Sequence, residues 1–274
     1  MKYASIQFEI SDKIAVLTLN RPEVKNALDN DIRVEIADVV RRLREGVDTK
    51  NLDVRALIIK GAGDAFSAGG DVKGMTISRT TAMIRNRIAE AHTWFSDLVN
   101  LEMPVIAAVN GPAFGAGFSL SLAADFILAT PNARFCSVFA RMGLIPDLAA
   151  LYLLPRIVGL QRAKEIVFSS CILKPDEAKS YGIVYDIVEE DEIDDAAMTL
   201  AQKFQGASMT AIGLSKVLLN RSFHTDQAAM IELEAFAQGA CVGTDDHKSS
   251  VSSFLNKQPF SFSGFGRSNW RKKT

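Results

Sequence analysis

Two glycine-rich turns form the sequence pattern with the clearest chemical use. The first runs from Gly61 to Asp71 after the apolar run 54–60, and the second runs from Asn110 to Gly117 after the apolar run 105–109. Small residues leave backbone N–H groups open to a ligand. Two such turns on adjacent strands could aim two N–H donors at one oxygen, which is the geometry of an oxyanion hole. The same spacing also fits two ordinary tight turns between a strand and a helix.

Most other catalytic signatures are absent from the sequence. His92, His224 and His247 have no partner at metal-ligand spacing, so we expect them on the surface or on helix faces and predict no metal site. The sequence holds no G-x-S-x-G elbow, no Walker A motif and no complete G-x-G-x-x-G motif. The two glycine-rich turns are therefore the features that stand out.

The elements that would position these turns alternate strands and helices. Strands are expected at 4–10, 13–20, 54–60, 105–109 and 126–129. A helix capped by Asp29 or Asn30 is expected, because apolar residues recur on one face. These residues are Ile32, Ile36, Val39 and Leu43. A second helix should run from about Ser78 to Leu101, where Pro104 stops it. The strand-strand-helix unit with parallel crossovers predicts an α/β fold.

After Asp147 helical patterns dominate the sequence. Helices are expected at 149–154, 161–168 and 175–181, a strand at 183–188, and successive helices from 190 to about 255. We therefore predict a core at 1–190, followed by a helical region at 191–274 whose end, from 258 onward, is loose.

Composition and charge exclude several classes of protein. The 274 residues are 48% hydrophobic and 23% charged, with a net charge of −1, which is typical of a globular protein and argues against nucleic-acid binding. No apolar run reaches the length of about 18 residues that spans a membrane. The N-terminus has no apolar signal core, which predicts a cytoplasmic protein. Three distant cysteines, Cys136, Cys171 and Cys241, suggest neither a disulfide framework nor a zinc site.

At its glycine-rich turns the sequence resembles the crotonase (enoyl-CoA hydratase/isomerase) superfamily. The segments that carry the resemblance are 19–22 (Leu-Asn-Arg-Pro), 26–28 (Asn-Ala-Leu), 66–71 (Phe-Ser-Ala-Gly-Gly-Asp), 104–117 (Pro-Val-Ile-Ala-Ala-Val-Asn-Gly and the second turn), 143–147 (Gly-Leu-Ile-Pro-Asp), 153–156 (Leu-Leu-Pro-Arg) and 158–159 (Val-Gly). Segments 246–247 and 253–257 look like the closing helix of the family. The resemblance runs in order over most of the chain, and the set is specific as a whole.

This resemblance implies a spiral of ββα units and a helical C-terminal region that forms trimers or dimers of trimers. It implies a role in fatty acid metabolism and an acyl-CoA thioester substrate, with coenzyme A entering as part of that substrate and no separate cofactor. It assigns the two enolate-stabilising N–H groups to Ala68 and Ala116. The family's coenzyme A contacts fall on Val24, Ala68, Gly69, Gly70 and Asp71. Asp71 could also be a helix cap.

The sequence departs from the hydratases of this family at both of their glutamates. Those positions are occupied here by Ser119 and Phe139, and neither can act as a carboxylate base. Hydration of a double bond needs both activation of water and protonation of carbon. The departure therefore argues against a hydratase.

One carboxylate, Asp147, remains in the segment 143–147 that carries the resemblance. Subgroups with an acid here look like the peroxisomal-type Δ3,Δ2-enoyl-CoA isomerases and the ring-opening isomerases of phenylacetate breakdown. Their 1,3-proton shift needs a single base, and burial among apolar neighbours would raise the pKa of Asp147. Locally, Asp147 could instead cap a helix. The resemblance favours the base, although Leu148-Ala149-Ala150 replaces the usual glycines and predicts a narrower pocket.

Two other interpretations remain open. In 4-chlorobenzoyl-CoA dehalogenase, which looks similar at Asp147, the aspartate is a nucleophile and works with a tryptophan and a histidine. Phe139 and Ser96 do not supply those groups here, and His92 lies one helical turn from Ser96. The protein could also be a non-catalytic acyl-CoA-binding module, against which Asp147 is the main argument.

Overall fold

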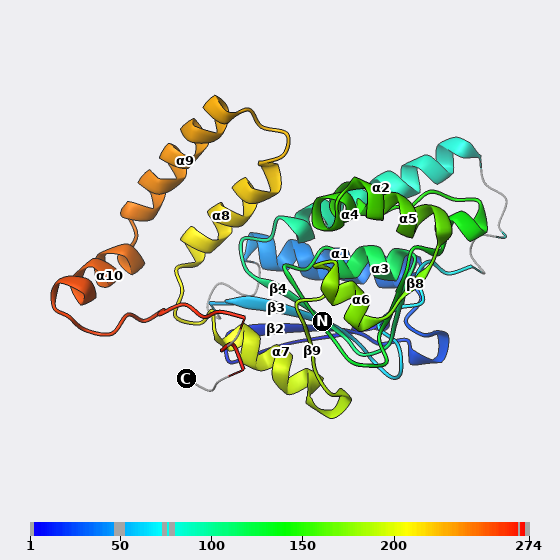
Figure 1. The fold of residues 1–274 in the computed structure, drawn as a ribbon, viewed down its shortest axis with the longest axis horizontal. Coiled ribbons are helices and arrows are strands. Elements are labelled where there is room, and N and C mark those ends of the chain that lie inside the picture. Colours follow the sequence, from blue (N-terminus) through cyan, green and yellow to red (C-terminus); the bar gives the residue numbers. More distant parts are fainter. Residues whose placement is uncertain (1–2, 47–52, 73–75, 77–79, 268, 272–274) are drawn as a thin grey trace.

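A six-stranded sheet forms the centre of the fold (Figure 1). The computed structural model describes residues 3–46, 53–72, 76, 80–267 and 269–271. The sheet order is β1-β2-β3-β4-β6-β9. Its strands are β1 (Ile6–Ser11), β2 (Ile14–Leu19), β3 (Ala56–Gly61), β4 (Val105–Val109), β6 (Phe126–Ala129) and β9 (Asp186–Ile187). Within this sheet, among the described residues, β1 and β2 pair antiparallel and the other neighbours pair parallel, so the expected parallel crossovers are confirmed.

Helices cover both faces of this sheet, because its central strands are apolar on both faces. On one face α1 (Asn30–Glu45) and α2 (Thr81–Val99) pack over a core that includes Leu17, Leu57 and Phe95. On the other face α7 (Ile193–Gln202) packs over a second core that includes Ile58 and Ile106. The chain is therefore layered as helix, sheet and helix (Figure 1).

The first expected helix is confirmed as α1. Asp29 caps it by accepting the Ile32 N–H at 3.0 Å, and its predicted apolar face is buried. The second expected helix is confirmed as α2, which Thr80 caps through the Met83 N–H. Residues 78–79 of the expected helix lie outside the described residues.

A second, smaller sheet was not expected from the sequence. It pairs β5 (Pro112–Phe114), β7 (Arg134–Cys136) and β8 (Ile172–Leu173), which are too short to show a strand pattern. Between and after these strands come α3 (Ala116–Ser121), α4 (Ala150–Val158), α5 (Leu160–Ser169) and α6 (Pro175–Ser180). Short 3-10 segments occupy Pro22–Val24, Val138–Met142 and Glu190–Glu192. Strand β5 of this small sheet lies within the second glycine-rich turn.

The C-terminal part of the chain is helical, as expected. The expected strand at 183–188 shortens to the two residues of β9. After α7, helices α8 (Met209–Arg221), α9 (Gln227–Val242) and α10 (Asp245–Leu255) form an arm that projects from the body (Figure 1). Lys216 of α8 anchors this arm with an ion pair of 2.7 Å to Asp125. The division into domains at 190/191 stays a prediction.

Candidate active site

The two glycine-rich turns lie side by side, as an oxyanion hole would require. Ser67 donates its N–H to the Pro112 carbonyl at 3.0 Å and accepts the Phe114 N–H at 2.9 Å. Gly69 has a φ of +94°, and a Cβ there would lie 2.5 Å from the Phe114 oxygen and 3.2 Å from the Ala116 nitrogen. Glycine is therefore required at position 69, because any side chain would force the turns apart.

The segment 24–28 completes the first turn. Asn26 is buried and donates from Nδ2 to the carbonyls of Ala62 and Ala65, while Leu28 donates its N–H to Gly69 at 2.7 Å. The predicted coenzyme A contacts, Val24, Ala68, Gly69, Gly70 and Asp71, therefore come from two segments that pair with each other. Whether Asp71 caps a helix is not decided here, because 73–75 lie outside the described residues.

The backbone donors differ from the prediction at one position. The Ala68 N–H donates to the Lys25 carbonyl at 2.8 Å, so it is already used within the protein. Within the described part of the chain, the N–H groups of Gly70 and Ala116 have no hydrogen-bond acceptor. Ala116 begins α3 after Gly115, which has a φ of +52°. The Ala68 N–H is therefore engaged within the protein, whereas the N–H groups of Gly70 and Ala116 are open to a ligand; which donors hold a substrate oxygen stays a prediction.

The two positions that hydratases fill with glutamates carry no acid, and both are buried. The Ser119 hydroxyl donates to the Gly115 carbonyl at 3.3 Å. The Phe139 ring lies 3.9 Å from where a Cβ of Gly115 would be, so it packs beside the second turn. A water molecule at these positions would contact the Phe139 ring and a Ser119 hydroxyl that already donates to the backbone. Neither group can take a proton from it as a carboxylate would.

Asp147 is not a helix cap, which was the alternative interpretation. The residue before α4 is Ala149, and no side chain caps this helix. The Asp147 Oδ1 atom is buried and has no hydrogen-bond partner among the described residues. Burial raises the pKa of this carboxyl, while the charge of Arg33 opposes that rise. A carboxylate with a buried, unpartnered oxygen is typical of a residue that transfers protons.

The turn after Asp147 is strained. Leu148 and Ala149 have φ values of +48° and +53°, a region that L-residues other than glycine rarely occupy. The Leu148 side chain is fully buried in the main core, so the expectation that it narrows a pocket is not supported. Core packing thus holds one residue of this turn.

Sequence reasoning missed two residues at this carboxyl. His92 of α2 accepts the Leu148 N–H at its Nε2 atom, at 3.1 Å. Arg33 of α1 has a buried Nε with no partner among the described residues, and burial lowers its pKa while Asp147 opposes this effect. His92 was expected to be an ordinary helix-face residue, and it lies 56 positions from Leu148. No local pattern could have signalled either residue.

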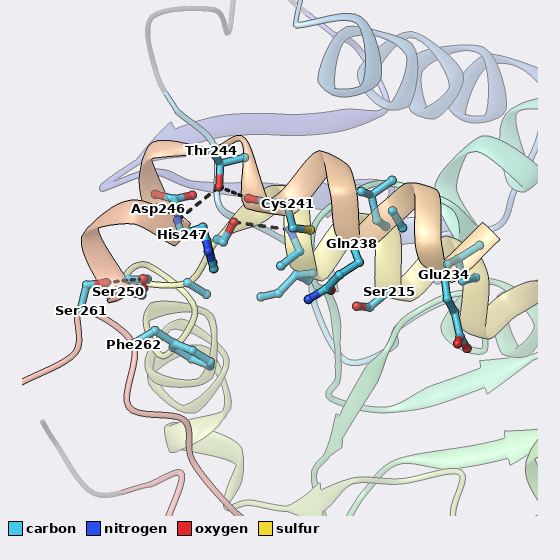
Figure 2. A pocket seen from close by; sticks show the side chains of 18 of the residues that line it. Ser215, Glu234, Gln238, Cys241, Thr244, Asp246, His247, Ser250, Ser261 and Phe262 are labelled. Atoms are coloured by element: carbon cyan, nitrogen blue, oxygen red, sulfur yellow. Dashed lines mark hydrogen bonds between the residues drawn. The ribbon is translucent and has the colours of Figure 1, made fainter. Parts of the chain in front are cut away.

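A hollow of about 840 Å³ lies between the helices of the arm (Figure 2). Its lining comes from α8, α9, α10 and the chain near Phe262, and includes none of the predicted site residues. Among the residues that the structure describes, no group of His, Cys, Asp and Glu could hold a metal ion. No helix in the described ranges is long and apolar enough to cross a membrane.

Comparisons with known proteins agree with this geometry. A family model described as enoyl-CoA hydratase/isomerase matches residues 9–265. Crotonyl-CoA hydratase of Syntrophomonas wolfei is 34% identical over 264 residues, which is 96% of this chain and 99% of that protein. The 1,2-epoxyphenylacetyl-CoA isomerase of Escherichia coli K12 is 30% identical over 264 residues, which is 92% of this chain and 95% of that protein.

A solved structure described as enoyl-CoA hydratase/isomerase, from Cupriavidus metallidurans CH34, superposes with a TM-score of 0.90 at 37% identity. The match covers 97% of this chain and 98% of that one. The ββα architecture is therefore shared along nearly the whole chain.

Proposed function

We propose, because this chain belongs to the enoyl-CoA hydratase/isomerase family, that it binds an acyl-CoA thioester and shifts a double bond within the acyl group. Asp147 is the base, and the N–H groups of Gly70 and Ala116 hold the thioester oxygen. The observation that carries the proposal is the buried, unpartnered Oδ1 of Asp147. Coenzyme A enters as part of the substrate, and the reaction needs no further cofactor.

The proposed reaction is a 1,3-proton transfer. Ionised Asp147 removes a proton from C2 of a 3-enoyl thioester, and the negative charge moves to the thioester oxygen as a dienolate. Two backbone donors stabilise that charge without moving. The protonated acid then returns the proton to C4, which leaves a 2-enoyl thioester and ionised Asp147. The raised pKa of Asp147 makes its carboxylate a stronger base for the removal step.

Hydration is the competing activity, because several relatives are named hydratases. Ser119 and Phe139 leave no second carboxylate to activate water. A panel of 3-enoyl-CoA and 2-enoyl-CoA thioesters should be incubated with pure protein, scoring isomerisation and hydration separately. The proposal requires isomerisation with negligible hydration. Robust conversion of crotonyl-CoA to its 3-hydroxyacyl product would contradict it.

The same assay separates two further alternatives. A non-catalytic binding module would bind thioesters without exchanging their C2 protons with solvent deuterium. Dehalogenase-like chemistry would release chloride from 4-chlorobenzoyl-CoA. It gains support from the contact between His92 and the Asp147 turn, but the Nε2 atom of His92 is already used there. The isomerase therefore remains the better-supported function.

Arg33 provides a pH prediction. Its charge lowers the pKa of Asp147, so Arg33→Met should raise that pKa further. The base must be ionised, so activity falls as the pH decreases through its pKa. This fall should occur at a higher pH in the variant than in the wild type. The measurement is kcat against pH. Arg41→Met, on the exposed side of the same helix, should leave the pH profile unchanged. An unchanged profile in Arg33→Met would mean that the charge of Arg33 does not act on the base.

We also infer that copies of this chain cover the arm, as a homotrimer or a dimer of trimers. Neither α9 nor α10 buries a single residue, and Phe236, Phe254 and Leu255 are each at least 70% exposed. Apolar faces of this kind mark protein interfaces. A place in fatty acid metabolism and a cytoplasmic location remain predictions from the sequence.

Phe236→Asp should therefore lower the mass of the assembly, because a buried charge without a partner disfavours association. The mass is measured by light scattering after size-exclusion chromatography. Gln227→Asp, at the exposed start of the same helix, should leave the mass unchanged. A monomeric mass for the wild-type protein would contradict the inferred assembly.

A further inference from the structure

One hydrogen bond joins α2 to the segment that carries the proposed base. The Nε2 atom of His92 accepts the Leu148 N–H at 3.1 Å, and Leu148 directly follows Asp147. From this contact we infer that His92 is a positioning residue: it fixes the strained turn and thereby the direction of the Asp147 carboxyl. The inference rests on the proposed function.

The turn needs such a contact, because its backbone is unfavourable. Two consecutive residues other than glycine, Leu148 and Ala149, are left-handed, and each costs free energy that the surroundings must offset. Core packing of the Leu148 side chain holds one part of the turn, and the Ala150 N–H on the Asp147 carbonyl, at 3.1 Å, holds another. The His92 bond satisfies the Leu148 N–H between them, and removing it would leave that donor without a partner on the protein.

The hydrogen bond that the Asp147 carboxyl accepts comes from its own backbone. Its Oδ1 atom has no hydrogen-bond partner in the described part of the chain. The direction of the carboxyl is therefore set mainly by its own backbone, which the turn fixes. A base that must take a proton at C2 and return it at C4 depends strongly on that direction.

The bond also fixes the chemistry of the imidazole. A nitrogen that accepts an N–H carries no proton, so a neutral His92 must carry its proton on Nδ1. A glutamine amide oxygen can reach about the same place as Nε2 and accept the same N–H, whereas leucine fills the space without an acceptor. The pair His92→Gln and His92→Leu thus separates the hydrogen bond from the bulk of the side chain.

The kinetic test compares these variants on the best 3-enoyl-CoA substrate. His92→Leu should lower kcat by about 10- to 100-fold with KM nearly unchanged, because a misdirected base slows the chemistry more than the binding. His92→Gln should restore most of kcat, and His247→Leu, exposed on the arm, should behave as wild type. Full activity in His92→Leu would overturn the inference. So would a His92→Gln variant as slow as His92→Leu, because the imidazole itself would then transfer protons.

A second readout does not depend on turnover. In protein labelled with ¹⁵N at its three histidines, the His92 ring, identified by its loss in His92→Gln, should show a protonated Nδ1 and an unprotonated Nε2. The opposite tautomer would overturn the inference. If wild-type protein converts no thioester while the ring shows the expected tautomer, the proposed function has failed and the hydrogen bond has not.

Discussion

Replacing Asp147 by asparagine should abolish isomerisation while leaving thioester binding nearly intact. The amide keeps the shape of the side chain but cannot accept the C2 proton, and loss of a general base lowers rates by ~10²–10⁴-fold. We expect this loss in kcat, measured on the best 3-enoyl-CoA, with little change in the dissociation constant of a saturated acyl-CoA. Asp191→Asn, at an exposed carboxylate, should keep wild-type kcat.

The same variant should be more stable than the wild type at neutral pH. Because burial raises the pKa of Asp147 in the folded state, its ionised form opposes folding; this penalty shrinks as the pH falls through the folded pKa and is gone below the unfolded pKa. Asp147→Asn should therefore raise the melting temperature at neutral pH and not at low pH. A variant that loses stability and keeps its turnover would show that Asp147 is structural.

Replacing Gly69 by alanine should cause the second large loss of activity. The added Cβ would lie 2.5 Å from the Phe114 oxygen and 3.2 Å from the Ala116 nitrogen, so the two turns must separate. Separation would move the Gly70 and Ala116 donors away from a common oxygen. Loss of one such donor lowers kcat by ~10²–10³-fold, and we expect a loss of at least this size, measured as kcat on folded protein.

Gly182→Ala is the matched control for this prediction. Gly182 also has a left-handed φ, +82°, but a Cβ there would meet nothing within 4 Å. Both variants carry the backbone strain of alanine at positive φ, and only Gly69→Ala adds the collision. We expect both variants to fold equally well, as checked by circular dichroism, and Gly69→Ala alone to have a low kcat. Equal kcat in the two variants would mean that the thioester does not lie between the turns.

The long elements could be predicted from the sequence because their signals are local. The face of α1 at Ile32, Ile36, Val39 and Leu43 repeats with the helical period, and its cap at Asp29 precedes it directly. The strands 105–109 and 126–129 are continuous apolar runs, as buried parallel strands require. The small sheet could not be predicted, because strands of two or three residues carry no periodicity.

The candidate site divides in the same way. The glycine-rich turns could be read from residue identity and spacing, and the family resemblance pointed to positions 119 and 139 without acids and to Asp147 as the remaining carboxylate. Which N–H groups are free depends on the folded chain, since the Lys25 carbonyl that accepts the Ala68 N–H lies 43 positions earlier in the chain. Packing of helices on the sheet also places His92 of α2 on the Leu148 N–H and the charge of Arg33 of α1 where it acts on Asp147. A hydrogen bond between distant segments depends on how helices pack on the sheet, and packing leaves no mark in the local sequence.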